Sequence, residues 1–222
     1  MSIKNNLSVL LKEIPENVKL VAVSKTKPIE DILEAYNSGQ KIFGENKAQE
    51  MIVKQSQLPE NIHWHFIGHM QTNKVRYITP FVALIEAVDS FKLLKEINKQ
   101  ANKINRVIDC LLQFHIATEE TKFGLDFDEA KGILDDPEFK IMKNIRITGL
   151  MGMATFTDNT ELIRSEFRTL KNYFYKLKEI YFSDEDYFKE ISMGMSGDYK
   201  IAIEEGSTIV RIGSLIFGAR TK

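Results

Sequence analysis

The chain has 222 residues, 43% of them hydrophobic, and its 30 basic and 31 acidic residues give a net charge of −1. This balance gives no reason to expect a nucleic acid or an anionic membrane as a partner, although a local basic patch remains compatible with it. A single cysteine, Cys110, excludes an intramolecular disulfide. Neither a signal-peptide core nor a transmembrane-length apolar stretch is present, so we expect a soluble cytoplasmic protein.

The sequence predicts strands and helices that alternate along the chain. It begins with a short amphipathic helix over residues 3–13, whose apolar face carries Ile3, Leu7, Leu10 and Leu11. Each strand after that is followed by a helix or a helical turn. The strands are predicted at residues 18–24, 41–43, 62–67, 82–88, 107–116, 145–151, 190–193 and 208–212.

Residues that favour helix ends support several of these helices. Pro28 stands at the expected first position of the helix after the first strand, and Gly39 lies just past its end. Ser90 is expected to cap a helix, and Asp126 and Glu129 have the spacing of a capping box. The longest predicted helix follows the sixth strand and carries apolar residues three and four apart: Ile163, Phe167, Leu170, Phe174, Leu177 and Tyr181.

This alternation predicts a parallel sheet. Eight strand–helix units in about 220 residues fit an α/β fold made of a single (β/α)8 TIM-type barrel with an extra N-terminal helix. A doubly wound open sheet is the alternative on the pattern alone. No linker, repeat or low-complexity tract divides the chain, so we expect one domain over residues 1–222.

Lys25 is the first candidate for chemistry. It follows the apolar run Val21–Val23, and Pro28 opens the next helix. Partial burial of an ammonium group lowers its pKa and makes the amine a nucleophile toward carbonyls. We therefore hypothesise that Lys25 forms a Schiff base with pyridoxal 5'-phosphate (PLP). The alternative is a lysine whose stem is buried and whose charge reaches solvent. Lys27 lies on the same strand parity, but next to the helix start we expect it to point toward solvent.

Two turns after the last strands are candidate phosphate sites. Barrel enzymes often bind phosphate after strands seven and eight. In Met193–Asp198 we expect Ser196 to cap the following helix and Gly197 to let a ligand approach the backbone. In the second turn, Gly213 and Ser214 offer backbone and hydroxyl donors. The alternative is two ordinary glycine turns with a serine cap.

Arg211 lies on the strand before the second of these turns. By strand alternation it shares a face with Ile209 and Gly213. If that face is the barrel interior, the buried guanidinium needs a partner. The partner is either an acidic side chain or the ring nitrogen of the cofactor, which an arginine would keep unprotonated.

Two histidines near the third strand are candidate metal ligands. His63 and His65 would share one strand face, as in some metal sites. No carboxylate or cysteine stands at a fitting spacing, and we expect His63 at the N-terminal end of its strand, so we expect no metal. Asn46 and His69 follow strand ends and are expected to line the site, the alternative being polar loop residues that bond to their own backbone.

Together these stretches resemble the pyridoxal phosphate homeostasis protein family, whose barrel is similar to the N-terminal domain of alanine racemase. The resemblance runs in order through nearly the whole chain. The stretches that carry it are Val23–Pro28, Phe43–Asn46, Gln49–Glu50, Trp64–Lys74, Gly149–Met151, Met193–Asp198 and Ser207–Gly218.

The resemblance implies a barrel with PLP on Lys25 and a ring nitrogen near Arg211. It implies phosphate contacts from Ser196, Gly197, Gly213 and Ser214. It also implies storage, buffering or delivery of PLP and a role in amino-acid balance, rather than a settled catalytic reaction. PLP-dependent apo-enzymes are then possible recipients, and we expect a monomer.

Two enzyme functions remain as alternatives. A PLP-dependent amino-acid racemase would need a second base, which alanine racemase obtains as a tyrosine from its partner subunit, and the chain is too short for the added domain of that enzyme. A Schiff-base aldolase barrel typically places its lysine near the sixth strand, and residues 145–151 contain no lysine. A visible absorption spectrum separates an aldolase from the other two, because only PLP gives a yellow protein.

Overall fold

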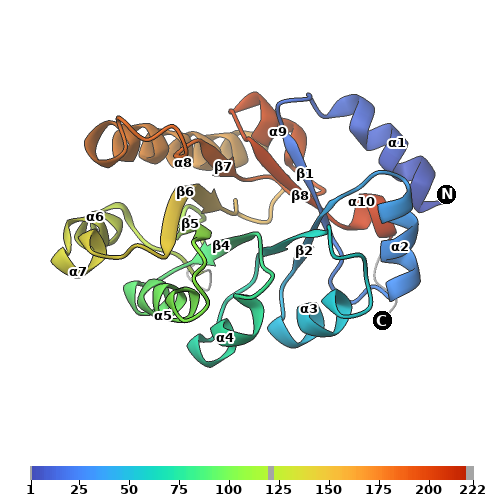
Figure 1. Cartoon of the computed structure of the whole chain (residues 1–222). Coiled ribbons are helices and arrows are strands. Elements are labelled where there is room, and N and C mark those ends of the chain that lie inside the picture. The colour runs from blue at the N-terminus through green and yellow to red at the C-terminus, as the bar shows by residue number, and fades with distance from the viewer. Residues whose placement is uncertain (1, 120–122, 219–222) are drawn as a thin grey trace.

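Eight parallel strands close into a barrel in the computed structural model, which describes residues 2–119 and 123–218 (Figure 1). The strands follow one another around the barrel in chain order, and β8 pairs with β1 to close it. The predicted (β/α)8 barrel is therefore confirmed over the open sheet. The strands are β1 (Lys19–Val23), β2 (Ile42–Glu45), β3 (His63–Phe66), β4 (Leu84–Val88), β5 (Ile108–Phe114), β6 (Ile145–Gly152), β7 (Glu190–Ser192) and β8 (Ile209–Ile212).

Helices surround the barrel, and the extra helix α1 lies outside it beside α2 and α10 (Figure 1). A 3-10 turn, η1 (Thr72–Lys74), leads directly into α4. The α-helices are α1 (Ile3–Glu13), α2 (Ile29–Asn37), α3 (Ala48–Gln55), α4 (Val75–Ile78), α5 (Phe91–Asn102), α6 (Phe127–Asp135), α7 (Pro137–Lys140), α8 (Thr160–Tyr181), α9 (Tyr199–Glu204) and α10 (Ser214–Phe217).

Of the helix starts predicted at Pro28, Ser90 and Asp126, two are confirmed and one is shifted by one position. Ser90 caps α5 by accepting a hydrogen bond from the backbone N–H of Leu93, and Asp126 and Glu129 form a complete capping box on α6. Pro28 is the N-cap of α2 rather than its first residue, a shift of one position. The short α7 was not predicted. Its start has ordinary signals, a proline in the first turn and the cap Asp136.

The barrel wall separates two apolar layers. Inside the barrel lies a small cluster contributed by five of the strands: Val21, Leu84, Ala87, Leu111, Met151 and Ile209. The larger cluster fills the space between the strands and the helices, and it includes the predicted apolar face of α8. Because the interior cluster plugs the barrel, a ligand can enter only at the strand ends, which is where barrels of this type carry their sites.

Helix α9 is anchored to α8 by a buried carboxylate. Arg164 Nη1 donates to Glu205 Oε1 at 2.7 Å, and Arg168 Nε donates to the other oxygen at 2.9 Å. Burial opposes the negative charge of Glu205, but the two arginines outweigh it and lower the pKa of this carboxyl. The anchor matters for function because α9 directly follows the predicted phosphate turn Met193–Asp198.

We expect E205Q to lower the free energy of unfolding by about 1 kcal/mol at neutral pH, since it removes one charge of this ion pair. The folded protein depresses this pKa, so the stabilisation is complete above the ordinary value of 4.5 and fades as the pH falls through the lower folded value. Urea unfolding should therefore show the difference at neutral pH and a smaller one in acid. E204Q is the matched control, because Glu204 pairs with Arg164 in a more exposed position. An equal loss in both variants would contradict this assignment.

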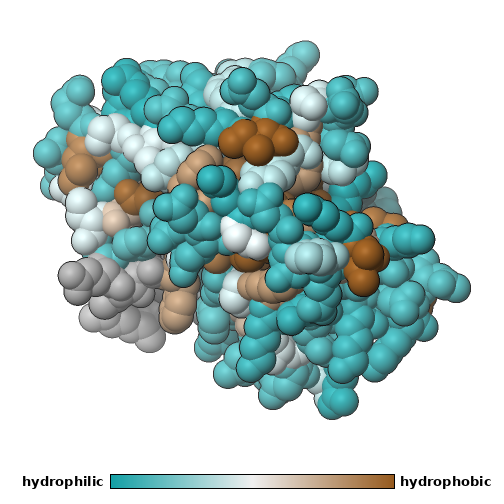
Figure 2. All heavy atoms as spheres, turned by 90° about the vertical axis from the view of Figure 1, so that its left-hand side faces the viewer, coloured by the Kyte–Doolittle hydropathy of each residue, from teal (hydrophilic) through white to brown (hydrophobic). Residues whose placement is uncertain are grey.

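The face formed around α6, α7 and α8 is mostly hydrophilic (Figure 2). The apolar side chains on its described part form small, separate spots rather than one continuous surface. Within residues 2–119 and 123–218, none of the helices is long and apolar enough to cross a membrane.

Candidate functional site

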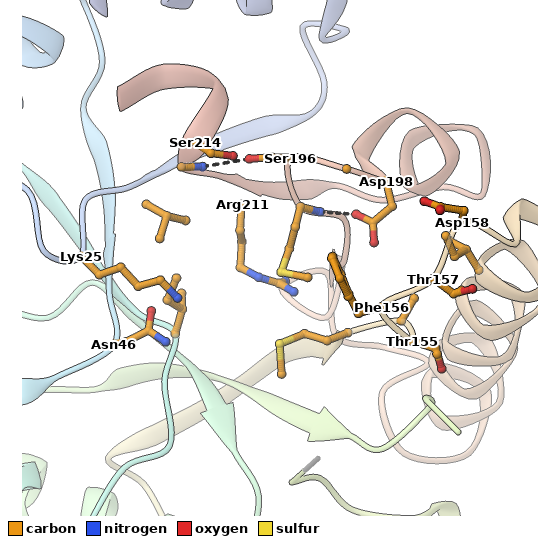
Figure 3. A pocket seen from close by; sticks show the side chains of 18 of the residues that line it. Lys25, Asn46, Thr155, Phe156, Thr157, Asp158, Ser196, Asp198, Arg211 and Ser214 are labelled. Atoms are coloured by element: carbon orange, nitrogen blue, oxygen red, sulfur yellow. Dashed lines mark hydrogen bonds between the residues drawn. The ribbon is translucent and has the colours of Figure 1, made fainter. Parts of the chain in front are cut away.

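A cavity of about 510 Å³ opens at the carboxyl ends of the strands (Figure 3). Its walls come from segments that follow β1, β2, β3, β6, β7 and β8, which are far apart in the sequence. Seven of the eight residues predicted from the sequence to form a site line this cavity. They are Lys25, Asn46, Ser196, Gly197, Arg211, Gly213 and Ser214.

Lys25 enters the cavity from the end of β1. Its half-buried side chain extends beside Asn46 (Figure 3). The next residue, Thr26, has a φ of 65°, which is uncommon for a residue other than glycine. The chain therefore turns sharply at this point, and the turn separates the directions of Lys25 and Lys27.

The prediction that Lys27 points toward solvent is wrong. Its Nζ donates to the backbone oxygens of Phe217 at 2.9 Å and Gly218 at 3.4 Å. These are carbonyls at the C-terminal end of α10, where a lysine is favourable. Lys27 also lines the cavity, but its amine is engaged by these carbonyls.

The two predicted phosphate turns lie against each other. The backbone N–H of Gly213 donates to Ser196 Oγ at 3.4 Å, and the N–H of Arg211 donates to the Gly194 oxygen at 2.9 Å. Ser196 and Ser214 both lie on this side of the cavity (Figure 3). The two loops therefore bring the hydroxyls of Ser196 and Ser214 to the same side of the cavity.

Ser196 does not cap α9, which corrects the prediction. The N-cap of that helix is Asp198, and the turn before it is closed by a 2.5 Å hydrogen bond from the Met195 N–H to Asp198 Oδ1. Gly194, with a φ of 95°, lets this turn pass close to the helix, because a Cβ there would lie 2.5 Å from the Cβ of Ala202. As a result the Ser196 hydroxyl faces Gly213 instead of the helix N–H groups.

Arg211 lies inside the barrel, which meets the condition under which its charge needs a partner, and only 4% of it is exposed. Its Nη1 donates to Ser192 Oγ at 2.5 Å and lies 3.8 Å from Glu86 Oε2, and its Nη2 donates to the Gly152 oxygen at 2.9 Å. Burial lowers the pKa of Arg211, and the charge of Glu86 opposes that shift. An acidic partner is thus present, and the guanidinium still lines the cavity.

Glu86 links Arg211 to His65 across the barrel. His65 Nδ1 lies 2.6 Å from Glu86 Oε1, and Ser192 donates to Glu86 Oε2 at 2.5 Å. Burial opposes the charge of Glu86, but His65, Arg211 and Ser192 together hold the pKa of this carboxyl below its ordinary value. The side chain of Arg211 therefore contacts the fully buried side chains of Ser192 and Glu86 on the interior side.

Asn46 offers a buried acceptor to the cavity. Its Oδ1 is buried and has no hydrogen-bond partner among the described residues. The segment sits tightly against the end of β3, because a Cβ at Gly68 would lie 2.4 Å from the Asn46 backbone oxygen. A buried polar atom without a partner is costly, so this oxygen is suited to a ligand group.

The structure does not bring His69 into the same cavity. Its Nδ1 lies 2.8 Å from Asp89 Oδ2, and its ring stacks on Phe123 at 4.4 Å. It lines a smaller neighbouring hollow that Asn46 shares. Its proposed contact with a cofactor stays a prediction. His63 lies at the start of β3, as expected, and no cluster of three or more potential metal-ligating side chains occurs in residues 2–119 and 123–218.

Comparison with known proteins identifies the chain's relatives. Residues 1–221 match the family model described as alanine racemase, N-terminal domain. The pyridoxal phosphate homeostasis protein of Aquifex aeolicus is 42% identical over 91% of this chain and 87% of its own length. That of Homo sapiens is 38% identical over 91% of this chain and 76% of its own length. The chain belongs to the pyridoxal phosphate homeostasis protein family.

Solved structures agree with this assignment. PipY of Synechococcus elongatus, solved with PLP bound, is 32% identical, with a TM-score of 0.88 over 98% of this chain and all of PipY. An alanine racemase of Clostridium difficile is 13% identical and has a TM-score of 0.76 over the whole of this chain but 56% of the racemase. The second likeness shows a shared fold alone.

One wall of the cavity was missed by the sequence analysis. This wall is formed by residues 153–158, which follow β6 and face the two phosphate turns. Thr155 is fixed by bonds from its N–H and hydroxyl to Glu166 at 2.7 and 2.6 Å, and Phe156 is 93% exposed. The available signal was position, since residues after a barrel strand line the site.

Proposed function

We propose that this protein holds PLP as a Schiff base on Lys25 and acts in intracellular PLP homeostasis, by storage, buffering or delivery, and in amino-acid balance. The single observation that carries the proposal is the meeting of a lysine, two serine–glycine turns and a buried arginine in one cavity. The relatives named as homeostasis proteins and the PLP-bound PipY structure support it.

The residues present fit the cofactor. A Cβ at Gly197 would meet no atom within 4 Å, so the backbone there borders open space that a phosphate can approach. Asn46 Oδ1 is a buried acceptor suited to a polar group of the ring. The aldehyde of PLP is the carbonyl partner that a lysine amine requires.

Each lining group has a separate role in this proposal. Lys25 supplies the amine. Ser196 and Ser214 donate hydroxyl hydrogens to phosphate, and Gly197 and Gly213 let the backbone come close. Arg211 faces the ring nitrogen and keeps it unprotonated, because a guanidinium donates hydrogen bonds and does not accept a proton. When bound, PLP supplies an electron-accepting ring, which is weakened in this state.

The same arrangement favours holding the cofactor over fast turnover. Racemisation needs acid–base groups on both faces of the cofactor, and Lys25 serves one face. An arginine beside the ring nitrogen is also compatible with a racemase, so a PLP-dependent amino-acid racemase stays the alternative function. We further propose that the chain acts as one barrel domain, as a monomer, and that PLP-dependent apo-enzymes receive its cofactor.

We expect purified protein loaded with PLP to absorb in the visible range and to show no amino-acid turnover near typical enzyme rates, about one per second or faster. Single L-amino acids would be incubated with it, following chirality and keto-acid formation. Mixing with an apo-enzyme should restore that enzyme's activity. Sustained turnover would favour a racemase or transaminase function over the homeostasis proposal. The lack of any visible band would contradict the binding of PLP as a Schiff base.

A further inference from the structure

A buried charge cluster lies beneath the turn that carries Lys25. It consists of Glu45, at the end of β2, with Glu50 and Lys54, both on α3, and we call it the Lys54 cluster. The side chains of Lys54 and Glu45 are 6% and 0% exposed, and that of Glu50 is 24% exposed. Lys54 Nζ lies 2.7 Å from an oxygen of each carboxylate.

The cluster holds the backbone on both sides of Lys25. On one side, Lys54 Nζ donates to the Ser24 backbone oxygen at 2.7 Å. On the other side, the Thr26 N–H donates to Glu50 Oε1 at 2.5 Å. The hydroxyl of Ser24 also donates to Glu45 Oε1 at 2.6 Å. The peptide groups before and after Lys25 are therefore both hydrogen-bonded to side chains of one helix, α3.

This turn needs such support. Thr26 has its positive φ in a conformation that costs free energy for a residue with a Cβ, and it persists only where neighbouring groups fix it. Without the hydrogen bond to Glu50, the Thr26 peptide can rotate to a more ordinary conformation. Rotation there changes the direction in which the preceding Lys25 leaves the backbone.

The cluster is an expensive way to stabilise the fold. Burying an ion pair commonly costs more in desolvation than the pairing returns, and apolar residues of similar volume often serve stability as well or better. Burial also raises the pKa of Glu45, against the effects of Lys54 and Ser24, and Glu45 Oε2 is buried with no hydrogen-bond partner in the described part of the chain. The contacts to the Lys25 turn are the evident use of these charges.

We propose that Lys54 and Glu50 are positioning residues, which hold the Ser24–Thr26 backbone so that the Lys25 amine reaches the aldehyde of the cofactor. The inference rests on the proposed function, because it concerns the bond between Lys25 and PLP. Neither residue lines the cavity, so neither is expected to touch the cofactor itself.

Two ligands separate positioning from general stability. PLP reports the bond to Lys25, whereas 4'-deoxypyridoxine 5'-phosphate has the same ring and phosphate but no aldehyde. We expect K54M to weaken PLP binding at least tenfold and to reduce the visible band, while the affinity for the deoxy compound changes by no more than about threefold. E50A should act in the same direction, and E50Q, which keeps an acceptor for Thr26, should stay close to the unaltered protein.

The matched control is K19M, which removes a lysine from the other end of β1, where Lys19 Nζ pairs with Glu190 Oε1 at 2.6 Å. It should change neither affinity. Equal losses for both ligands in K54M and E50A, or no loss in either, would overturn the positioning role. If K54M fails to fold, E50A and E50Q decide, because the Glu50 side chain is less buried than that of Lys54. If the unaltered protein binds neither ligand, the proposed function itself fails, and the positioning role with it.

Discussion

Replacing Lys25 with alanine should abolish the Schiff base and its visible absorption band. Among the lysines of residues 2–119 and 123–218, Lys27 is the one other that lines this cavity, and its amine is engaged by the carbonyls of Phe217 and Gly218. Binding of PLP should become non-covalent and weaker, because the phosphate turns and Arg211 remain. The measurement is a visible spectrum during titration with PLP, followed by borohydride reduction and peptide mapping.

The matched control is K27A, which should keep the band. In the unaltered protein, borohydride should fix the pyridoxyl group on the peptide that contains Lys25. A band that survives in K25A, or a label that maps to another peptide, would show that a different amine holds the cofactor. Loss of the band in both variants would point to a damaged β1 end, and the thermal unfolding midpoint of each variant would reveal it.

The barrel could be predicted because each unit carries its own local signal. Each element has its own signal, such as an apolar run for a strand, proline or glycine at a helix end, or the capping box at Asp126. Closure of the sheet into a barrel could be predicted only from the number of strand–helix units. The missed α7 is four residues long, too short for a periodic pattern to indicate it. The exact ends of helices are also difficult to predict from the pattern, and Pro28 is one position away from its predicted place at the start of α2.

The part of the site that could be predicted is the part that follows from where a residue stands in the barrel. Residues after strands one, two, seven and eight must meet at one end, so Lys25, Asn46, Ser196 and Ser214 could be grouped without coordinates. Loop conformation determines the direction of the Ser196 hydroxyl, the bonds of Lys27 and the position of His69. The periodic pattern of apolar residues does not predict loop conformation. The Lys54 cluster depends on a contact between α3 and the β1 turn, and nothing in its spacing indicates burial.

Replacing Ser196 and Ser214 together with alanine should weaken PLP far more than pyridoxal, which lacks the phosphate. The two hydroxyls come from adjacent turns that bond directly to each other through Gly213 and Ser196. Ser196 Oγ accepts that bond, so its own hydrogen can be donated to a phosphate oxygen. A hydrogen bond to a charged group contributes about 1.5–3 kcal/mol, so losing two should cost roughly a hundredfold or more in affinity.

The comparison of the two ligands is what makes this test specific. Pyridoxal keeps the aldehyde and the ring, so it should bind the double variant nearly as well as the unaltered protein. S56A/S165A is a matched control, since both serines are exposed and bond locally to backbone oxygens on α3 and α8. An equal loss for PLP and pyridoxal would mean that the serines hold the turns in shape without contacting phosphate. In that case the phosphate contacts would have to come from the backbone at Gly197 and Gly213 and from Arg211, and an R211K variant would be the next to measure.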